Sequence, residues 1–342
     1  MTSATSPAQV AGRGRVPPAL NLLALAGLTA AAALAGLCFG DAITSPAEAL
    51  RLLFQPDGSY AQVVVSTVRL PRVVAAALAG SALAVAGAIM QGVTQNPLAS
   101  PGLLGINSGA ALGVTVAAAL YGAGTNTAFA GAAALGAGLA AVAVYALASA
   151  GRGGASPLKL TLAGAIFGAF LTSLTTAILI IDAQTLDQIR LWTAGSVANR
   201  PLSLSFAVAP WILGGLAASI ALARPINALG LGKDVAAGLG QNAALSRAAA
   251  AVTVAALAGG AVALAGPIGF VGLVTPHVAR TLVGADNRWI MPYCAVGGAL
   301  LLLLADLVSR LVAPSSELPV GVTMALIGCP FFIHLARARI RR

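Results

Sequence analysis

Long apolar stretches, nearly free of charge and separated by short breaks, make up most of this chain. A helix that crosses a membrane needs about 20 predominantly apolar residues. Ten stretches have that character, and they are 19–39, 71–91, 101–121, 128–148, 158–181, 203–223, 247–265, 266–284, 289–309 and 318–336. Only 8% of the 342 residues are charged, whereas soluble domains carry about a quarter, so a soluble globular fold is excluded. The sequence predicts an all-α polytopic membrane bundle of about ten transmembrane helices.

The seventh and eighth stretches form one long apolar run that is interrupted by Gly259-Gly260 and Gly266-Pro267. Two clean spans and one broken or re-entrant helix are both open on this pattern. Residues 1–18 are polar, hold Pro and Gly, and are followed by no cleavage site of the signal-peptide type. We interpret them as an uncleaved cytoplasmic tail before a single transmembrane domain at 19–342.

The positions of Lys and Arg indicate which way the spans face. With ten spans and both termini on the inner side, 13 of the 19 Lys and Arg residues lie inside and 6 lie outside. Cytoplasmic loops carry an excess of Lys and Arg, so this distribution predicts a multi-pass protein of the cell membrane with both termini in the cytoplasm. The net charge of +10 therefore lies in orienting loops, and we expect no binding of nucleic acid.

Neither the cysteines nor the histidines have the spacing of a metal site. Cys38, Cys294 and Cys329 lie far apart in or beside apolar stretches, as small core residues do. His277 and His334 have no His, Cys or carboxylate near them at ligand spacing. We expect this chain to bind no metal and no cofactor.

The segment Arg69-Leu70-Pro71-Arg72 stands at the outer mouth of the second stretch. Pro71 suits the first turn of a helix, because its missing N–H would be unpaired there. Two roles are open for the two arginines. They could anchor the helix end by reaching to the interface, or they could dock an acidic surface of a soluble partner.

Asp306 is a carboxylate inside the ninth stretch, and Arg310 follows four residues later. Side chains at this spacing meet on a helix, so a structural ion pair is one interpretation. A proton-relay carboxylate, as in a secondary transporter, is the other. Arg310 also lies toward the outer face, where it could form one basic ring with Arg69 and Arg72.

The inner loop 91–105 holds no Lys or Arg, which is unusual for a cytoplasmic loop. Two prolines, Pro97 and Pro101, lie in one five-residue part of this loop, and a plain turn explains them. A pore constriction made from Asn96 and Leu98 is the functional alternative.

The longest inner segment, at about 225–246, has apolar residues with a weak helical period. Gly230-Leu231-Gly232-Lys233 superficially looks like a phosphate-binding loop, but that motif needs Gly and Ser or Thr where this chain has Asn227 and Asp234. A nucleotide site is therefore excluded. A short helix pair presented to a cytoplasmic partner explains the segment better than a passive linker does.

Seven motifs occur along the chain in a fixed order. They are Arg-Leu-Pro-Arg at 69–72, Gly87 to Gln91, Asn-Pro-Leu-Ala-Ser-Pro at 96–101, Leu-Gly-Ile-Asn-Ser-Gly-Ala at 104–110, Gly-Phe-Val-Gly-Leu-Val-Thr-Pro-His at 269–277, Ala-Asp at 305–306 and Glu-Leu-Pro-Val-Gly at 317–321. Together they resemble the FecCD permease family, the membrane subunits of type II ABC importers for ferric siderophores, haem and cobalamin. The resemblance runs from about residue 60 to the C-terminus.

The resemblance implies ten helices, with 247–265 and 266–284 as two of them. It also implies a second permease subunit, two ATPase subunits that bind ATP and Mg²⁺, and an extracytoplasmic substrate-binding protein. Arg69, Arg72 and Arg310 would meet acidic residues of that binding protein. The cytoplasmic gate would contain Asn96, Pro97 and Leu98. The coupling to the ATPase would use Leu229, Gly230, Leu231, Gly232, Asp234, Ala236, Leu239 and Gly240.

The function expected from this resemblance is that of a permease subunit of an ATP-driven importer, with no catalytic residue of its own. Its substrate would be an iron chelate, and a ferric siderophore is chosen on the breadth of the family. Haem and cobalamin remain alternatives, because no residue of the chain separates them. A proton-coupled secondary transporter that uses Asp306 is the alternative from a different class, and it would work without an ATPase.

Overall fold

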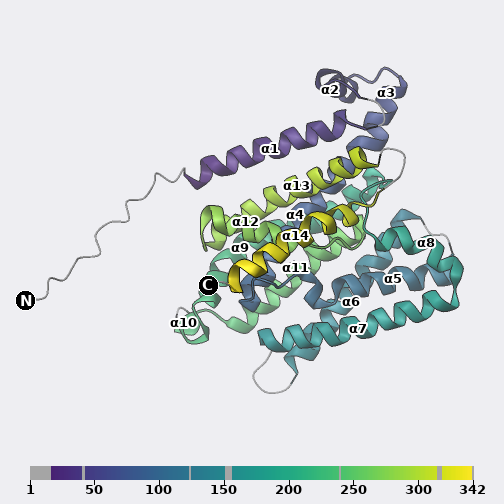
Figure 1. Ribbon diagram of the computed structural model, residues 1–342. Coiled ribbons are helices and arrows are strands. Elements are labelled where there is room, and N and C mark those ends of the chain that lie inside the picture. The colour runs from purple at the N-terminus through teal and green to yellow at the C-terminus, as the bar shows by residue number, and fades with distance from the viewer. Residues whose placement is uncertain are drawn as a thin grey trace, which may run out of the picture.

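The computed structural model describes residues 17–40, 43–122, 125–150, 156–238, 240–313 and 318–340. Within these ranges every regular element is a helix, and the long helices lie side by side in one elongated bundle (Figure 1). We name the ends of the bundle after two short helices, α10 (Lys233–Gly238) and α2 (Pro46–Phe54). The first turn of α1 and the last turn of α14 both lie at the α10 end (Figure 1).

Each of the ten apolar stretches contains one helix of the bundle. The helices are α1 (Pro18–Cys38), α4 (Leu70–Thr94), α5 (Ile106–Tyr121), α6 (Asn126–Ser149), α7 (Pro157–Ile181), α9 (Leu202–Gly230), α11 (Ala243–Ala265), α12 (Val271–Val283), α13 (Asn287–Val312) and α14 (Val320–Ile340). Among the described residues, seven helices are long and apolar enough to cross a membrane. Of the other three, α5 has 16 residues and α12 has 13, fewer than expected for a span, and α14 has 21 residues.

Short helices connect the spans. At the α2 end, α2 and α3 (Tyr60–Val63) lead into the π-helical turn η1 (Val64–Arg69), which runs directly into α4. The 3₁₀ turn η2 (Pro101–Leu104) precedes α5, and α8 (Ala183–Thr193) joins α7 to α9.

The long apolar run of the seventh and eighth stretches forms two helices, α11 and α12, so the two-helix prediction is confirmed. The break lies at 266–270, where Gly266 has a φ of +73° and Phe270 a φ of +66°. Gly259-Gly260 does not break the helix, contrary to expectation. Gly260 instead lets α11 pack closely, since an added Cβ would lie 3.1 Å from the side chain of Ile212 in α9.

Helix α4 lies at the centre of the bundle and packs against α9, α11, α12 and α13. In the most apolar window of the span that contains α4, 78% of the residues are buried, against 17% in α1 and in α7, so those two helices lie at the periphery. Glycines allow the close packing of α4. A Cβ at Gly80 would overlap the carbonyl of Gly298 in α13, and small residues of this kind are what lets helix backbones approach in lipid.

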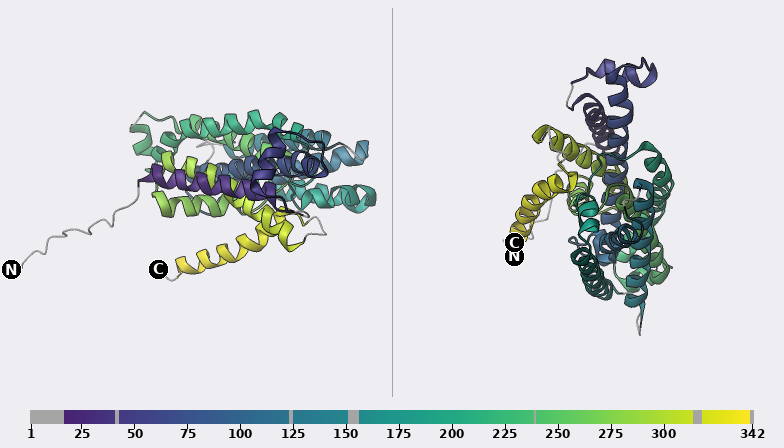
Figure 2. Two further views of the ribbon diagram at one scale, coloured as in Figure 1. Left: turned by 90° about the horizontal axis from the view of Figure 1, so that it is seen from above. Right: turned by 90° about the vertical axis from the view of Figure 1, so that its right-hand side faces the viewer.

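Helices α5, α6 and α7 form a second group, which joins the first where α6 packs on α11. The last helix, α14, packs on α13 and α12 at its start and then diverges from the bundle (Figure 2). Val320, Thr323 and Met324 are buried, whereas Leu326 and Ile333 are exposed. The face of α14 that carries Leu326 and Ile333 therefore lacks a neighbour among the described residues.

Candidate functional site

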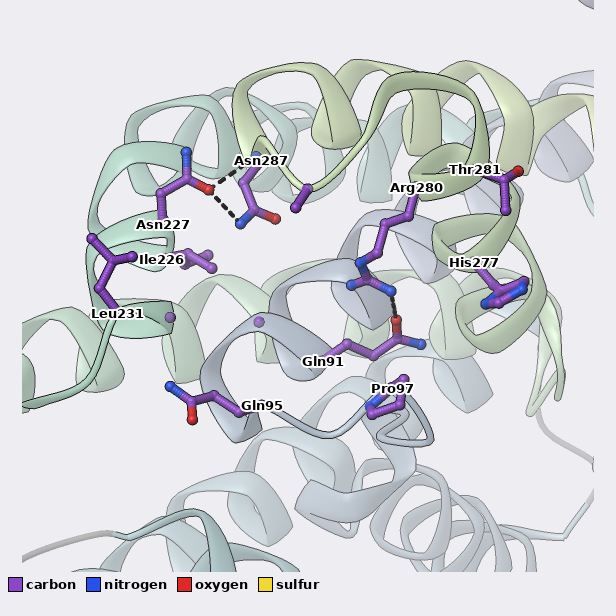
Figure 3. A pocket seen from close by; sticks show the side chains of 13 residues that line it. Gln91, Gln95, Pro97, Ile226, Asn227, Leu231, His277, Arg280, Thr281 and Asn287 are labelled. Carbon is purple, nitrogen blue, oxygen red and sulfur yellow. Dashed lines mark hydrogen bonds between the residues drawn. The ribbon is translucent and has the colours of Figure 1, made fainter. Parts of the chain in front are cut away.

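A cavity of about 680 Å³ lies at the α10 end, between the last turns of α4, α9 and α12 and the start of α13 (Figure 3). Four amide side chains line it, and they are Gln91, Gln95, Asn227 and Asn287. His277 and Arg280 of α12 also face it, together with Pro97 from the predicted gate. Its lining contains no carboxylate among the described residues.

Gln91 ties α4 to α12 by satisfying a carbonyl that a proline leaves unpaired. Pro276 has no backbone N–H, so the carbonyl of Gly272, one turn earlier in α12, lacks its helical donor. The side-chain amide of Gln91 donates to that carbonyl at 3.2 Å, and Arg280 donates to Gln91 Oε1 (Figure 3). This contact needs two close backbones, and a Cβ at Gly87 would overlap the Gly272 carbonyl. The motifs at 87–91 and 269–277 therefore form one interlocked site.

Asn227, in the last turns of α9, joins that helix to the beginning of α13. Its Oδ1 accepts from the backbone N–H of Asn287 at 3.0 Å and from Asn287 Nδ2 at 2.7 Å, and its own Nδ2 donates to Asp286 Oδ1 at 2.8 Å. We call these three residues the amide clamp. The hydrogen bond from Arg288 lowers the pKa of Asp286 to about 2, helped by the bond from Asn227. The Asp286 carboxylate, which accepts the hydrogen bond from Asn227, is therefore ionised at neutral pH.

The predicted gate residues form a tight turn after α4. Gln95 ends α4 in the left-handed region, with a φ of 51°, and its side-chain amide donates to the carbonyl of Leu229 at 2.6 Å. Asn96 Oδ1 accepts from the backbone N–H of Leu98 at 2.9 Å, which is an Asx turn. The side chain of Leu98 is half exposed, and Pro97 lines the cavity. The turn that explains the prolines is present, and the gate role stays a prediction.

The predicted coupling residues lie at the end of α9 and around α10. Leu229 and Gly230 end α9, Asp234 and Ala236 belong to α10, and Leu231, Gly232 and Gly240 lie in the adjoining turns. Leu239 lies outside the described residues. The expected helix pair is thus a single six-residue helix after the end of α9. Leu231 is 63% exposed, whereas Leu229 and Ala236 are buried. This segment therefore has side chains packed against the bundle and an apolar side chain exposed at its surface.

At the α2 end, Asp306 lies between two arginines. Arg72 Nε donates to Asp306 Oδ1 at 2.7 Å, and Arg310 Nη2 lies 2.9 Å from Asp306 Oδ2. The Asp306 side chain is only 1% exposed. We call these three residues the charged knot. It contains the ion pair expected from the spacing of Asp306 and Arg310, and it adds Arg72 of α4 as a second partner.

Arg69 and Arg310 both hold the C-terminal end of α1. Arg69 Nη1 donates to the carbonyls of Leu37 at 2.9 Å and Cys38 at 3.0 Å, and Arg310 Nη1 donates to the carbonyls of Gly36 at 2.9 Å and Phe39 at 3.1 Å. The last carbonyls of a helix have no intrahelical donor and carry a partial negative charge, which cations stabilise. Arg69 is 4% exposed. The three predicted docking arginines are therefore mostly buried and bonded within the chain, and their docking role stays a prediction.

The amide clamp was not found from the sequence. Asp286-Asn287 carries a signal for a helix start, because Asp and Asn are favoured caps, and the Asp286 side chain does accept from the backbone N–H of Arg288. Asn227 carried a weaker signal, as a polar residue just after the sixth stretch, at the start of the inner segment 225–246. Its partners are 59 and 60 residues away, and no local pattern identifies them.

Within the described residues no group of three His, Cys, Asp or Glu side chains is placed to hold a metal ion. His277 instead contacts the ring of Phe331 edge to face, with the centroids 6.0 Å apart.

The fold defines a multi-pass α-helical membrane protein. The model of the FecCD transport family matches residues 28–338, and the chain belongs to that family. It is 40% identical over 305 residues to the Fe(3+)-citrate import system permease protein YfmD of Bacillus subtilis, covering 88% of this chain and 89% of that protein. It is 42% identical over 284 residues to the ferric enterobactin transport system permease protein FepD of Escherichia coli, covering 81% and 83% of the two chains.

A solved structure of a metal-chelate-type ABC transporter in an inward-facing conformation has the same fold. It superimposes with a TM-score of 0.84 at 28% identity and covers 94% of this chain and 99% of the other. The ten-helix bundle of the described residues is therefore the permease fold of that class.

Proposed function

We propose that this chain is the permease subunit of an ATP-driven importer that carries an iron chelate, and specifically a ferric siderophore. The observation that carries the proposal is the family match over residues 28–338, which includes nearly all of the membrane helices. The two relatives described above are named for ferric citrate and ferric enterobactin, and both are chelates of Fe³⁺.

In this proposal the α10 end faces the cytoplasm. The excess of Lys and Arg in the loops assigned to that side, 13 against 6, supports the orientation. Two ATPase subunits would then bind below α10 and would hold ATP and Mg²⁺, and the permease would contribute no catalytic residue. A second permease subunit would complete the translocation path, and the exposed apolar side chains of α14 at Leu326, Ile327 and Ile333 offer surface for it.

The mechanical link to the ATPase would be the segment 229–240. Its buried residues, Leu229 and Ala236, would fix it to the bundle, and its exposed edge at Leu231 and Val235 would seat in the ATPase. Closure of the ATPases on nucleotide would move this segment and, through Gln95 and Leu229, the turn at Asn96 to Leu98. That turn is where we place the cytoplasmic gate.

The binding protein would dock at the α2 end. Arg72 and Arg310 both pair with Asp306, and Arg69 lies on the end of α1, so this buried cluster holds three guanidiniums against one carboxylate. Because these groups are mostly buried, they would act on an acidic partner largely through their field, which steers and orients association. The rate of docking should therefore fall steeply as the salt concentration rises.

The proton-coupled alternative has less support. Both oxygens of Asp306 lie within 3 Å of a guanidinium nitrogen, which is the geometry of a structural ion pair, and a carrier must instead exchange its proton with water during transport.

The test is uptake into proteoliposomes that contain this permease with its genetic-neighbour ATPase and binding protein. Labelled ferric siderophore should accumulate on the side where the ATPase subunits bind, and only when ATP is supplied on that side. Haem and cobalamin, supplied in parallel, test the two alternative substrates. Uptake that ignores ATP and follows an imposed proton gradient would overturn the proposal.

A further inference from the structure

Helices α4 and α13 are joined at two levels of the bundle. At the α2 end, Arg72 of α4 donates to Asp306 of α13 at 2.7 Å in a buried environment. Near the middle, Gly80 and Gly298 bring the two backbones into direct contact. A buried ion pair and a glycine-to-glycine contact both resist sliding, because neither can shift without loss of a charge partner or a steric overlap. These contacts join α4 and α13 at two levels, and we call the pair the α4–α13 unit.

This unit reaches from one end of the bundle to the other. Helix α13 has 26 residues, which corresponds to about 39 Å at 1.5 Å per residue. Pro292 lies inside it, and the helix continues through that position. The charged knot lies near one end of the unit and the amide clamp at the other.

At the α10 end the unit holds the last turns of α9 from two sides. Asn227 is bound by Asp286, the N-cap of α13, at 2.8 Å and by Asn287 of α13 at 2.7 and 3.0 Å. Gln95, at the end of α4, donates to the carbonyl of Leu229 at 2.6 Å. The coupling segment begins at Leu229, so the α4–α13 unit fixes the point from which that segment extends.

We propose that Asn227 and Gln95 are positioning residues that transmit movement between the coupling segment and the α2 end, through the α4–α13 unit. This inference rests on the proposed function, since it assigns the route by which a loaded binding protein stimulates the ATPase. The contacts at the α10 end are hydrogen bonds of neutral amides and one partly exposed carboxylate. Such bonds can break and re-form in a transport cycle at small cost, whereas the charged knot cannot.

The experiment measures coupling in the complete complex of permease, ATPase and binding protein in lipid nanodiscs. The readout is the ratio of ATPase rates with and without saturating substrate-loaded binding protein. Asn227→Ala should lower that ratio about fivefold or more, the size of a typical coupling between sites, and Gln95→Ala should lower it less. The amount of ATPase that co-purifies with the permease should stay unchanged, which excludes loss of assembly as the cause.

Asn242→Ala is the matched control. Asn242 is an asparagine at the same end, but its side chain accepts from the backbone N–H groups of Ala244 and Leu245 in its own helix. Its loss should leave the stimulation ratio at the wild-type value. If Asn227→Ala assembles poorly, Asn287→Ala is a second variant for the same measurement. It removes the 2.7 Å hydrogen bond from Asn287 Nδ2 to Asn227 Oδ1 and leaves Asn227 bound to Asp286.

A double variant tests whether the two ends act through one route. Arg72→Gln should also lower the ratio at saturating binding protein, and its combination with Asn227→Ala should be no worse than the stronger single variant. Effects that multiply would show two independent routes and would overturn the inference, as would wild-type stimulation in Asn227→Ala. Absence of ATP-dependent uptake by the unmodified complex would instead overturn the proposed function, so the two failures are distinguishable.

Discussion

Each end of α13 has an aspartate paired with an arginine of that helix, since Asp306 lies within it and Asp286 is its N-cap, but the two pairs lie in different surroundings. Asp306 has a side chain 1% exposed and two arginine partners, which are themselves 14% and 11% exposed. Asp286 has a side chain 30% exposed, and its partner Arg288 is 61% exposed. The same chemical pair is thus buried at the α2 end and partly open to solvent at the α10 end.

This difference separates a fixed end from one that can move. Charges taken out of water interact strongly, and the loss of one partner leaves another buried without compensation. Charges near water are screened, and their pairing contributes little. We therefore expect substitutions at the charged knot to act on stability as well as on coupling, and substitutions at the amide clamp to act mainly on coupling.

The largest effect is expected for Asp306→Ala. This change leaves Arg72 and Arg310 buried without a carboxylate, and it should cost about 3–5 kcal/mol of folding stability. The measurement is the yield and melting temperature of the permease in detergent. Replacement of all three groups by apolar residues, in Arg72→Met/Asp306→Leu/Arg310→Met, is the control. It leaves no buried charge unpaired and should melt well above Asp306→Ala, but below the wild type because the carbonyls of Gly36 and Phe39 lose the donor Arg310. If Asp306→Ala melts as the wild type does, the knot has no structural role.

The next effect is expected for Arg69→Met, which removes the donor that caps α1 at Leu37 and Cys38. The cost should be about 2 kcal/mol, because the bonds are charged and buried. Hydrogen exchange of the C-terminal turn of α1 should increase, while α13 stays protected. Arg51→Met is the control, since Arg51 is paired at the exposed surface with Asp57, and it should leave α1 unchanged. Equal exchange in both variants would contradict the capping role.

The sequence is sufficient to predict the ten helices of the bundle, but it did not predict the short connecting helices α2, α3 and α8. The composition of each stretch, and not its neighbours, decides whether it can lie in a membrane, so all ten stretches contain a helix. Lengths are less predictable. Helix α12 is short because its chain turns at Gly266 and Phe270, both with positive φ, and that turn depends on the packing around it.

The sites are predictable only where the partners are close in sequence. The pair of Asp306 and Arg310 follows from a spacing of four residues. Arg72, the other partner of Asp306, lies 234 residues away, and no local pattern connects them. Arg69 was expected to be exposed at the outer end of the second stretch, because cations at helix ends usually reach the interface. It is buried because the end of α1 supplies carbonyls that satisfy it.

A smaller effect is expected for Asp286→Asn, the counterpart of the Asp306 substitution at the other end. The new amide keeps an oxygen for Asn227 and loses the pairing with Arg288, so folding stability should fall by less than about 1 kcal/mol. The same isosteric change at Asp306 should cost several times more, because no water can replace the lost charge there. Melting of the two variants side by side measures the difference between the ends, and equal losses would contradict it.

The smallest effect concerns pH. The hydrogen bond from Arg288 lowers the pKa of Asp286 from 3.8 to about 2, so the folded protein favours the ionised carboxylate. A lowered pKa contributes stability that is complete above the unfolded value of about 3.8 and is lost as the pH falls toward 2. The amide clamp should therefore be insensitive to pH between about 5 and 8 and should loosen only below about 4. The protection factor of the Asn287 amide, which donates to Asn227, reports this directly, and Asp286→Asn should abolish the acid transition. A loss of protection near neutral pH would mean that another group controls the clamp.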